Sequence, residues 1–242
     1  MPATLGALRT SNPTFEFGNS NRVRIWLRIA LLFFGLILFS QAIWIAGPEL
    51  YHTTVIRLAL DDKARPSTRL EQERAQRAAS LAGVRGDLWS ESAFAYSSQL
   101  WNAKPDLSTE NAIAVQKDLE NAIRYSPHRG DAWLMFAGMA ARYKWREYKP
   151  SSLLKMSYYT APKEAALIPL RLMIALREWP SDPELQELIL GEIRLVLTRL
   201  PNLRSSLIAA YGAASGEGKI AVEQAASKID ASQLKWITGK TP

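Results

Sequence analysis

The chain has 242 residues, of which 48% are hydrophobic, 13 are glycine and 13 are proline. This composition is sufficient to bury a core and argues against global disorder. It contains no cysteine, which excludes disulfides, thiolate metal sites and cysteine nucleophiles. The net charge is +7, but the basic residues are interspersed: outside the first 28 residues, 26 basic side chains accompany 22 acidic ones. Nucleic acids select clustered basic surfaces, so we expect no nucleic-acid partner.

The first predicted element is a transmembrane helix over residues 25–47. Its centre, Ile29 to Ala46, has 18 residues without a charge, and eleven of them are Leu, Ile or Phe. These eleven favour membrane insertion by about 3–6 kcal/mol. Trp26 and Trp44 are spaced to lie at the two interfaces of a bilayer. A buried core helix and a cleaved signal peptide are the alternatives, but the run lacks a polar face and exceeds the usual length of a signal peptide. Gly47-Pro48 is expected to end the helix.

Basic residues on one side of this segment predict its orientation. Arg22, Arg24 and Arg28 precede or open the span, whereas the ten residues after Ala46 contain no Lys or Arg. By the positive-inside rule, residues 1–24 form a short cytoplasmic tail and the C-terminal part is exported. We therefore expect a single-pass protein of a bacterial inner membrane, with residues 48–66 as a membrane-proximal connector and a periplasmic body.

The rest of the chain is predicted to be helical throughout, so the expected fold class is all-α. Residues 167–176 and 184–200 carry apolar side chains at spacings of three and four, and no run alternates as a strand would. Antiparallel hairpins follow from helices of this length joined by short turns. The expected N-caps are Ser67, Ser108 or Thr109, Thr160, and Ser181.

One phrase occurs twice, 44 residues apart: RGDLW at Arg85 to Trp89 and RGDAW at Arg129 to Trp133. In both copies a helix ends, the chain turns and a new helix begins. We expect Asp87 and Asp131 to be N-cap residues, with Trp89 and Trp133 one turn inside the helix. The repetition predicts a helix–turn–helix unit that is used twice.

The second copy resembles the tetratricopeptide repeat. Ala122, Pro127 and Trp133 match the small residue, the proline and the large aromatic residue of that family's junction, and Ala137 fits its close-packing position. The first copy has Gly83 in place of the proline, the period is 44 rather than about 34, and a third junction is expected near Pro162. The resemblance implies a helical-repeat region over 67–180, with a helical hairpin or cap over 181–242. It also implies that the chain binds proteins or peptides.

The layout as a whole, an N-terminal anchor followed by a degenerate helical-repeat body, is similar to small accessory proteins of bacterial exopolysaccharide and O-antigen gene clusters. This similarity implies an adaptor that gathers protein partners, among them a polysaccharide polymerase or export complex. An assembly factor for another membrane complex, such as cytochrome maturation, and an envelope enzyme acting on glycans are the alternatives.

No arrangement in the sequence predicts catalysis, a metal or a cofactor. The two histidines, His52 and His128, lack ligands at helical spacing, and RGD is better explained as part of a helix start than as an adhesion motif. Aromatic and basic residues alternate in 142–150, which is the predicted partner-binding segment, with glycan binding as a further option. Its candidate residues are Arg142, Tyr143, Trp145 and Tyr148.

Overall fold

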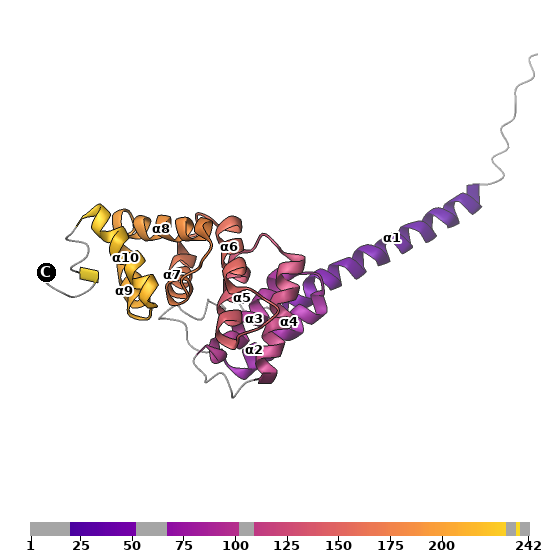
Figure 1. The fold of residues 1–242 in the computed structure, drawn as a ribbon. Helices are drawn as coiled ribbons and strands as arrows, with labels where there is room; N and C mark the ends of the chain where they lie inside the picture. The colour runs from indigo at the N-terminus through magenta and orange to yellow at the C-terminus, as the bar shows by residue number, and fades with distance from the viewer. Residues whose placement is uncertain (1–19, 52–66, 102–108, 231–235, 238–242) are drawn as a thin grey trace, which may run out of the picture. The chain divides into compact units, whose positions relative to one another are not determined.

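The structure is a computed structural model that describes residues 20–51, 67–101, 109–230 and 236–237. These residues form ten α-helices and contain no strand, so the prediction of an all-α fold is confirmed (Figure 1). The connector expected over 48–66 lies largely outside the described residues, as do most of the cytoplasmic tail and residues 102–108.

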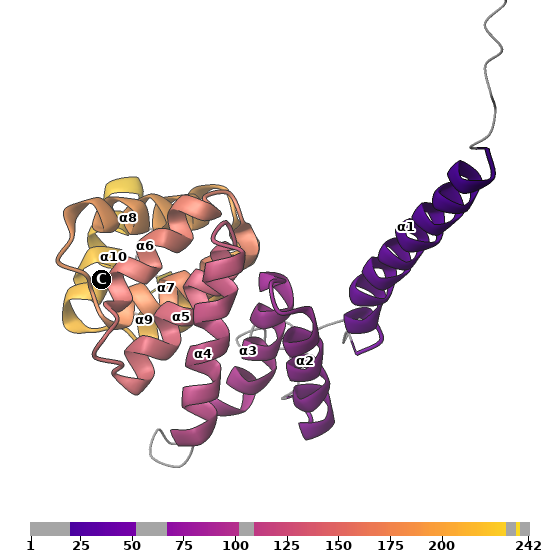
Figure 2. The same cartoon turned by 90° about the vertical axis from the view of Figure 1, so that its right-hand side faces the viewer.

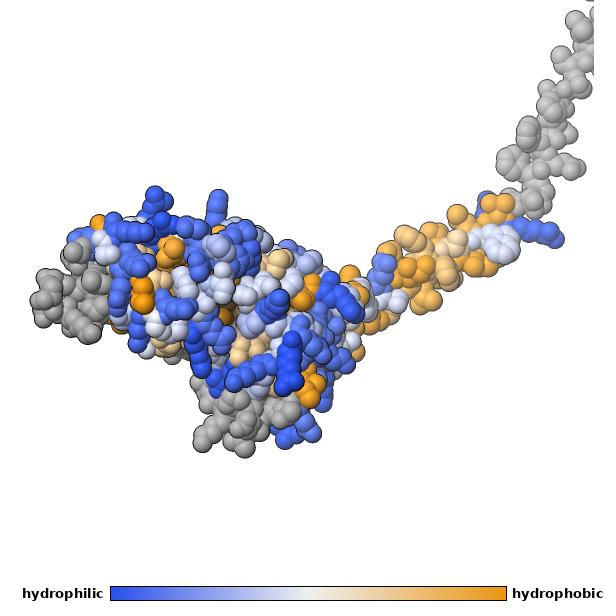
Figure 3. Space-filling view, in the orientation of Figure 1, coloured by the Kyte–Doolittle hydropathy of each residue, from blue (hydrophilic) through white to orange (hydrophobic). Residues whose placement is uncertain are grey.

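Helix α1, Ser20–Glu49, contains the predicted span. Residues Arg22–Glu49 are long and apolar enough to cross a membrane, and the 18-residue apolar window within them has no buried residue, which sets it apart from a core helix. Figure 3 shows hydrophobic side chains along this helix from one end to the other. The helix continues two residues beyond Gly47 and includes Pro48, so the predicted stop at Gly47-Pro48 was too early.

Residues 47–242 form a second compact unit, which begins with a run of helical hairpins. Its first five helices are α2 (Arg69–Ala82), α3 (Gly86–Leu100), α4 (Thr109–Tyr125), α5 (Gly130–Tyr143) and α6 (Pro150–Thr160). Consecutive helices pack together here: α2 with α3, α3 with α4, and α5 with α6 (Figure 2). The core includes Leu119, Leu134 and Phe136, all with no exposed surface.

The C-terminal helices pack in a different order. They are α7 (Ile168–Arg177), α8 (Pro183–Thr198), α9 (Arg204–Gly212) and α10 (Gly216–Ile229). Helix α7 packs mainly against α9, and α8 packs against α10, so neighbours in space are not neighbours in sequence. Their apolar residues join the same core as α3 to α6. Helix α8 is therefore part of this core.

The doubled phrase forms the same turn twice. The indole Nε1 of Trp89 donates to the carbonyl of Gly83 at 2.7 Å, and that of Trp133 donates to the carbonyl of Pro127 at 2.7 Å. Each tryptophan lies one turn inside its helix, as predicted, and thereby ties the start of that helix to the end of the preceding one. The turn is thus repeated at the same offset of 44 residues as the sequence.

The glycine of each phrase marks a close helix contact. A Cβ on Gly86 would lie 2.7 Å from the carbonyl oxygen of Ala122, near the end of α4. A Cβ on Gly130 would overlap the side chain of Ala161, which follows α6. Each glycine therefore lets the start of one helix touch the end of the next helix in the chain, α3 on α4 and α5 on α6. The third expected junction, near Pro162, follows α6 and leads through a 3-10 turn to α7.

The N-cap predictions for the two aspartates were wrong. Arg85 and Arg129 occupy the N-cap positions, and Asp87 and Asp131 are the second residues of their helices. Each aspartate accepts two hydrogen bonds from the arginine two residues earlier, with Arg85 Nη2 at 2.6 Å from Asp87. The hydrogen bonds from Arg85 lower the pKa of Asp87. The carboxylates still lie in the first turn, where they oppose the positive end of the helix dipole.

Three other caps also differ from the predictions. Thr68 rather than Ser67 caps α2, in a reciprocal pair with Glu71, and Asp182 rather than Ser181 caps α8. Thr160 is the last residue of α6, where its hydroxyl donates to the carbonyl of Met156. For α4 the predicted cap was Ser108 or Thr109; Ser108 lies outside the described residues, and Thr109 is the first residue of the helix. At α2 and α8 the adjacent oxygen-bearing side chain is the cap, so the start of each helix lies one residue later than predicted.

Candidate functional site: a basic pocket between α5 and α7

The segment 142–150 divides into a packed part and an accessible part. Tyr143, Trp145 and Tyr148 are partly buried and pack on the core. The ring centroid of Phe136 lies 5.8 Å from that of Trp145 and 4.6 Å from that of Tyr148. The Tyr148 hydroxyl donates to Glu120 at 2.7 Å, and burial together with this carboxylate raises the pKa of Tyr148 to about 12. These aromatics hold the segment in place after α5.

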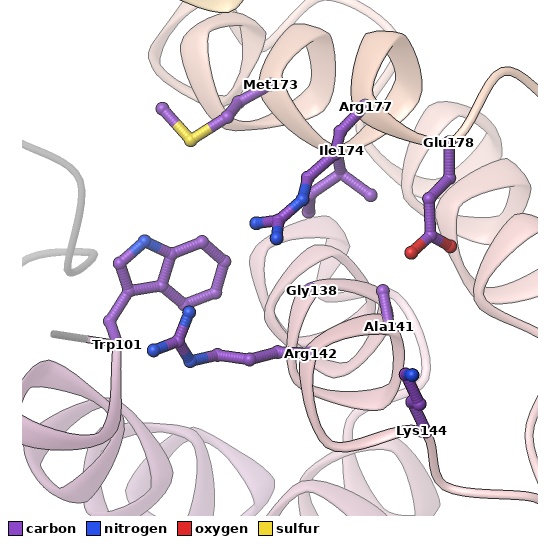
Figure 4. Close-up of a pocket in the computed structure, with 9 residues that line it drawn as sticks. All are labelled: Trp101, Gly138, Ala141, Arg142, Lys144, Met173, Ile174, Arg177 and Glu178. Carbon is purple, nitrogen blue, oxygen red and sulfur yellow. The ribbon is translucent and has the colours of Figure 1, made fainter. Parts of the chain in front are cut away.

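Arg142 reaches a pocket of about 180 Å³ between the C-terminal ends of α5 and α7. Figure 4 shows its guanidinium group and that of Arg177 turned toward the indole of Trp101, while Glu178 lies on the far side. The pocket has an apolar floor and a charged rim. Its lining residues are Trp101, Gly138, Ala141, Arg142, Lys144, Met173, Ile174, Arg177 and Glu178.

Helix α5 positions Trp101 through two hydrogen bonds to the end of α3. Arg142 Nε and the Tyr143 hydroxyl both donate to the carbonyl oxygen of Leu100, at 3.2 and 3.3 Å. The last carbonyls of a helix have no partner within it, so these donors satisfy one of them and fix the residue that follows. Arg142 thus has a structural role as well as a place in the pocket wall.

Gly138 provides the space for this indole. A Cβ at Gly138 would lie 2.9 Å from Trp101 Cη2 and 3.0 Å from Ile174 Cδ1. Any larger residue would push one of these side chains aside. The floor of the pocket therefore depends on a glycine in the middle of α5.

Lys144 has a left-handed backbone, with φ 52° and ψ 46°, directly after α5. It is the one non-glycine residue with positive φ in the described part of the chain. This conformation places its N–H, and that of Trp145 at 3.1 Å, on the carbonyl of Ala140 and so closes the helix end. Glycine is the usual residue at such a position because a Cβ there costs about 1–2 kcal/mol. Lys144 occupies this position despite that cost, and its exposed ammonium group lies at the pocket rim.

A second pocket of about 240 Å³ adjoins the first, since Ile174 and Glu178 line both. Its remaining wall comes from the start of α6 and from the turn after α7, including Trp179, Pro150 and Pro180. The two pockets therefore adjoin one another at the C-terminal end of α7, where Ile174 and Glu178 belong to both.

A larger pocket, about 390 Å³, lies between α6 and α8, and its wall includes Tyr158 and Glu192. Arg171 Nη1 lies 3.4 Å from Glu192, and the Tyr158 hydroxyl donates to Glu192 at 2.7 Å. Arg171 also donates to the carbonyls of Ser157 and Ala161 and so satisfies the end of α6. Burial raises the pKa of Glu192 to about 7. All three polar side chains are engaged with one another, which makes this cluster a structural element of the α6–α8 contact.

Sequence reasoning located one wall of the basic pocket and missed the others. Trp101, Gly138 and Arg177 come from three helices, and no spacing in the sequence relates them. The buried Arg171 did leave a signal, since it is a charged residue inside the apolar run of 167–176. The anchor residues Arg22, Arg24, Arg28, Trp26 and Trp44 all lie on α1 with exposed side chains.

Among the residues that the structure describes, no group of three or more His, Asp or Glu side chains is placed to hold a metal ion. No family model matches the chain, and comparisons with curated proteins and with solved structures find no similar protein.

Proposed function

We propose that the chain is a membrane-anchored adaptor whose helical body binds protein partners on the exported side of a bacterial inner membrane. The observation that carries the proposal is α1, which exposes a continuous apolar surface over a length that matches a bilayer. Arginines before the span and their absence after it support a cytoplasmic N-terminus and a periplasmic body.

The body supports binding rather than catalysis. The basic pocket has a single carboxylate in its wall, Glu178, whereas hydrolysis of a glycan ordinarily uses a pair of carboxyl groups about 5–10 Å apart. The hairpins of α2 to α6 and the repeated turn support the resemblance to a tetratricopeptide array, in which such helices present binding surfaces. From the layout of the sequence we further propose exopolysaccharide or O-antigen biosynthesis as the pathway, with a polymerase or export complex as the partner.

Photo-crosslinking in intact membranes tests the adaptor function. A photoreactive residue in place of Ala141, in the pocket wall, should give discrete adducts with a protein when the full-length chain is expressed at its native level. The same residue in place of Ser227, on the exposed face of α10, serves as the control. Identical patterns from the two positions, or no protein adduct from either, would contradict binding at this surface.

A fusion of alkaline phosphatase to the C-terminus tests the orientation, because the enzyme is active only outside the cytoplasm. We expect activity with the native sequence. Inactive fusions that are stably expressed would place the body in the cytoplasm and reverse the proposed topology.

A further inference from the structure

The chemistry of the basic pocket indicates which kind of partner it takes. Resting on the proposed adaptor function, we infer that the pocket binds an acidic segment of a partner protein that inserts one apolar side chain beside Trp101. Four features of the pocket carry this inference: the charge of its rim, its size, its continuation along α7 and the backbone of Lys144.

The rim has an excess of positive charge. Among the residues that line it, Lys144 and Arg177 are exposed cations that oppose the single carboxylate of Glu178. Lys144 and Arg177 are exposed, and neither forms an ion pair with a carboxylate in the described part of the chain. Charges of one sign around an apolar pocket favour a ligand of the opposite sign and speed its association.

The size of the pocket selects a side chain rather than a whole small molecule. Pockets for drug-sized ligands and cofactors have volumes of about 300–1,000 Å³, and this one has about 180 Å³. Its floor is formed by Gly138, Met173 and Ile174, with the Trp101 indole at the side. One aliphatic or aromatic side chain fills such a space, in the manner of the buried anchor residues that dominate protein interfaces.

The second pocket, whose wall includes Trp179, extends the site beyond the end of α7. Because Ile174 and Glu178 belong to both walls, a ligand that leaves the first pocket along α7 enters the second. Two adjoining hollows along one helix fit an extended peptide. An acidic polysaccharide also satisfies the charge of the rim, but its hydroxyl-rich surface leaves the apolar floor without a partner.

Lys144 provides independent support. A glycine would close α5 at this position without strain, and the helix end itself makes no use of the lysine side chain. Strained backbone is retained mainly where the side chain has a task, and Lys144 is one of the residues that line the pocket.

Fluorescence anisotropy with the full-length chain in lipid nanodiscs tests the inference. The probe is a labelled 12-residue peptide of glycine and serine with four glutamates around one leucine. One companion peptide has lysines for the glutamates, and another has alanine for the leucine. We expect the acidic leucine peptide to bind, the lysine peptide to show no binding, and the alanine peptide to bind at least tenfold more weakly. Raising the salt from 50 to 500 mM should weaken binding.

Variants link the binding to the pocket. Arg177→Glu should weaken the acidic peptide at least tenfold, whereas Lys228→Glu, which makes the same charge change on α10, should alter it less than twofold. Lys144→Gly should weaken the peptide while it raises the Tm, a combination that loss of structure does not produce. Equal affinity for the acidic and lysine peptides, or an equal effect of the two charge reversals, would overturn the inference.

An acidic glycan provides the competing outcome. If a polyglucuronate oligomer binds more tightly than the peptide, and if Arg177→Glu weakens it to the same extent, the ligand is a glycan and the inference is wrong. If neither probe binds but the photoreactive residue at position 141 still gives protein adducts in membranes, the adaptor function stands. Only the inference that the partner segment is acidic is then wrong. Absence of the adducts would instead count against the adaptor function itself.

Discussion

Gly86→Ala tests whether the glycine of the repeated RGDxW phrase is needed for the close packing of α3 on α4. The added Cβ would lie 2.5 Å from Ser126 Oγ and 2.7 Å from the carbonyl oxygen of Ala122. An unstrained carbon–oxygen contact is about 3.3–3.6 Å, so the start of α3 would have to retreat from the end of α4 by about 0.6–0.9 Å. The Ser126 hydroxyl can rotate, but the backbone of Ala122 lies inside a helix and cannot.

The expected cost follows from two opposing effects. Overpacking in a tight contact costs about 1–3 kcal/mol, and the better helix propensity of alanine returns up to about 1 kcal/mol. We therefore expect Gly86→Ala to lower the free energy of unfolding by about 1–2 kcal/mol, which corresponds to a fall in Tm of about 2–8 °C for a body of this size. Gly130→Ala should behave in the same way, because its Cβ would overlap the side chain of Ala161.

Thermal unfolding of the full-length chain, followed by circular dichroism in detergent, measures this effect. The matched control is Gly191→Ala, in the middle of α8, where a Cβ would meet no atom within 4 Å. That substitution should stabilise the chain by about 0.5–1 kcal/mol. If Gly86→Ala is neutral, or stabilises as Gly191→Ala does, the close contact between α3 and α4 does not require glycine at this position.

Three further predictions follow from the same structure. Trp89→Phe and Trp133→Phe should each cost about 0.5–1.5 kcal/mol in denaturant unfolding through loss of the indole hydrogen bond, and clearly unequal costs would contradict the equivalence of the two turns. Because burial raises the pKa of Glu192 from 4.5 to about 7, the folded state holds this proton between those values and the unfolded state does not. Stability should therefore fall as the pH rises from about 4.5 to 7, and Glu192→Gln should remove that part of the dependence; identical pH profiles would show that the carboxyl group is ionised throughout. Lys144→Gly should raise the free energy of unfolding by about 1 kcal/mol, and a loss of stability would show that the lysine side chain supports the fold.

The fold class and the repeated turn could be predicted because both depend on local patterns. Apolar residues at spacings of three and four mark helices wherever they occur, and RGDxW recurs in an identical local setting. The exact caps could not be predicted, because Thr68 and Ser67, or Asp182 and Ser181, are adjacent residues of similar chemistry. Only the backbone angles decide which of them starts the helix.

The pocket could be predicted only in part, because its walls are brought together by packing. The basic and aromatic pattern of 142–150 identified Arg142, but the same pattern gave no means to separate it from Tyr143, Trp145 and Tyr148, which brace the core. Trp101 and Arg177 are 76 positions apart, and Gly138 lies between them in a helix where glycine has no local reason to occur. The order of α7 to α10, in which alternate helices pair, was likewise set by tertiary contacts that no local spacing encodes.

Membrane integration of α1 is the claim on which the adaptor function depends, and alkaline extraction followed by flotation tests it most directly. Membranes that contain the full-length chain are washed with carbonate at pH 11 and then floated through a sucrose gradient. An integrated helix resists this wash because its apolar surface remains in lipid. The account predicts that the intact, uncleaved chain floats with the lipid. A chain that is released into the soluble fraction, whether whole or shortened at its N-terminus, would contradict it.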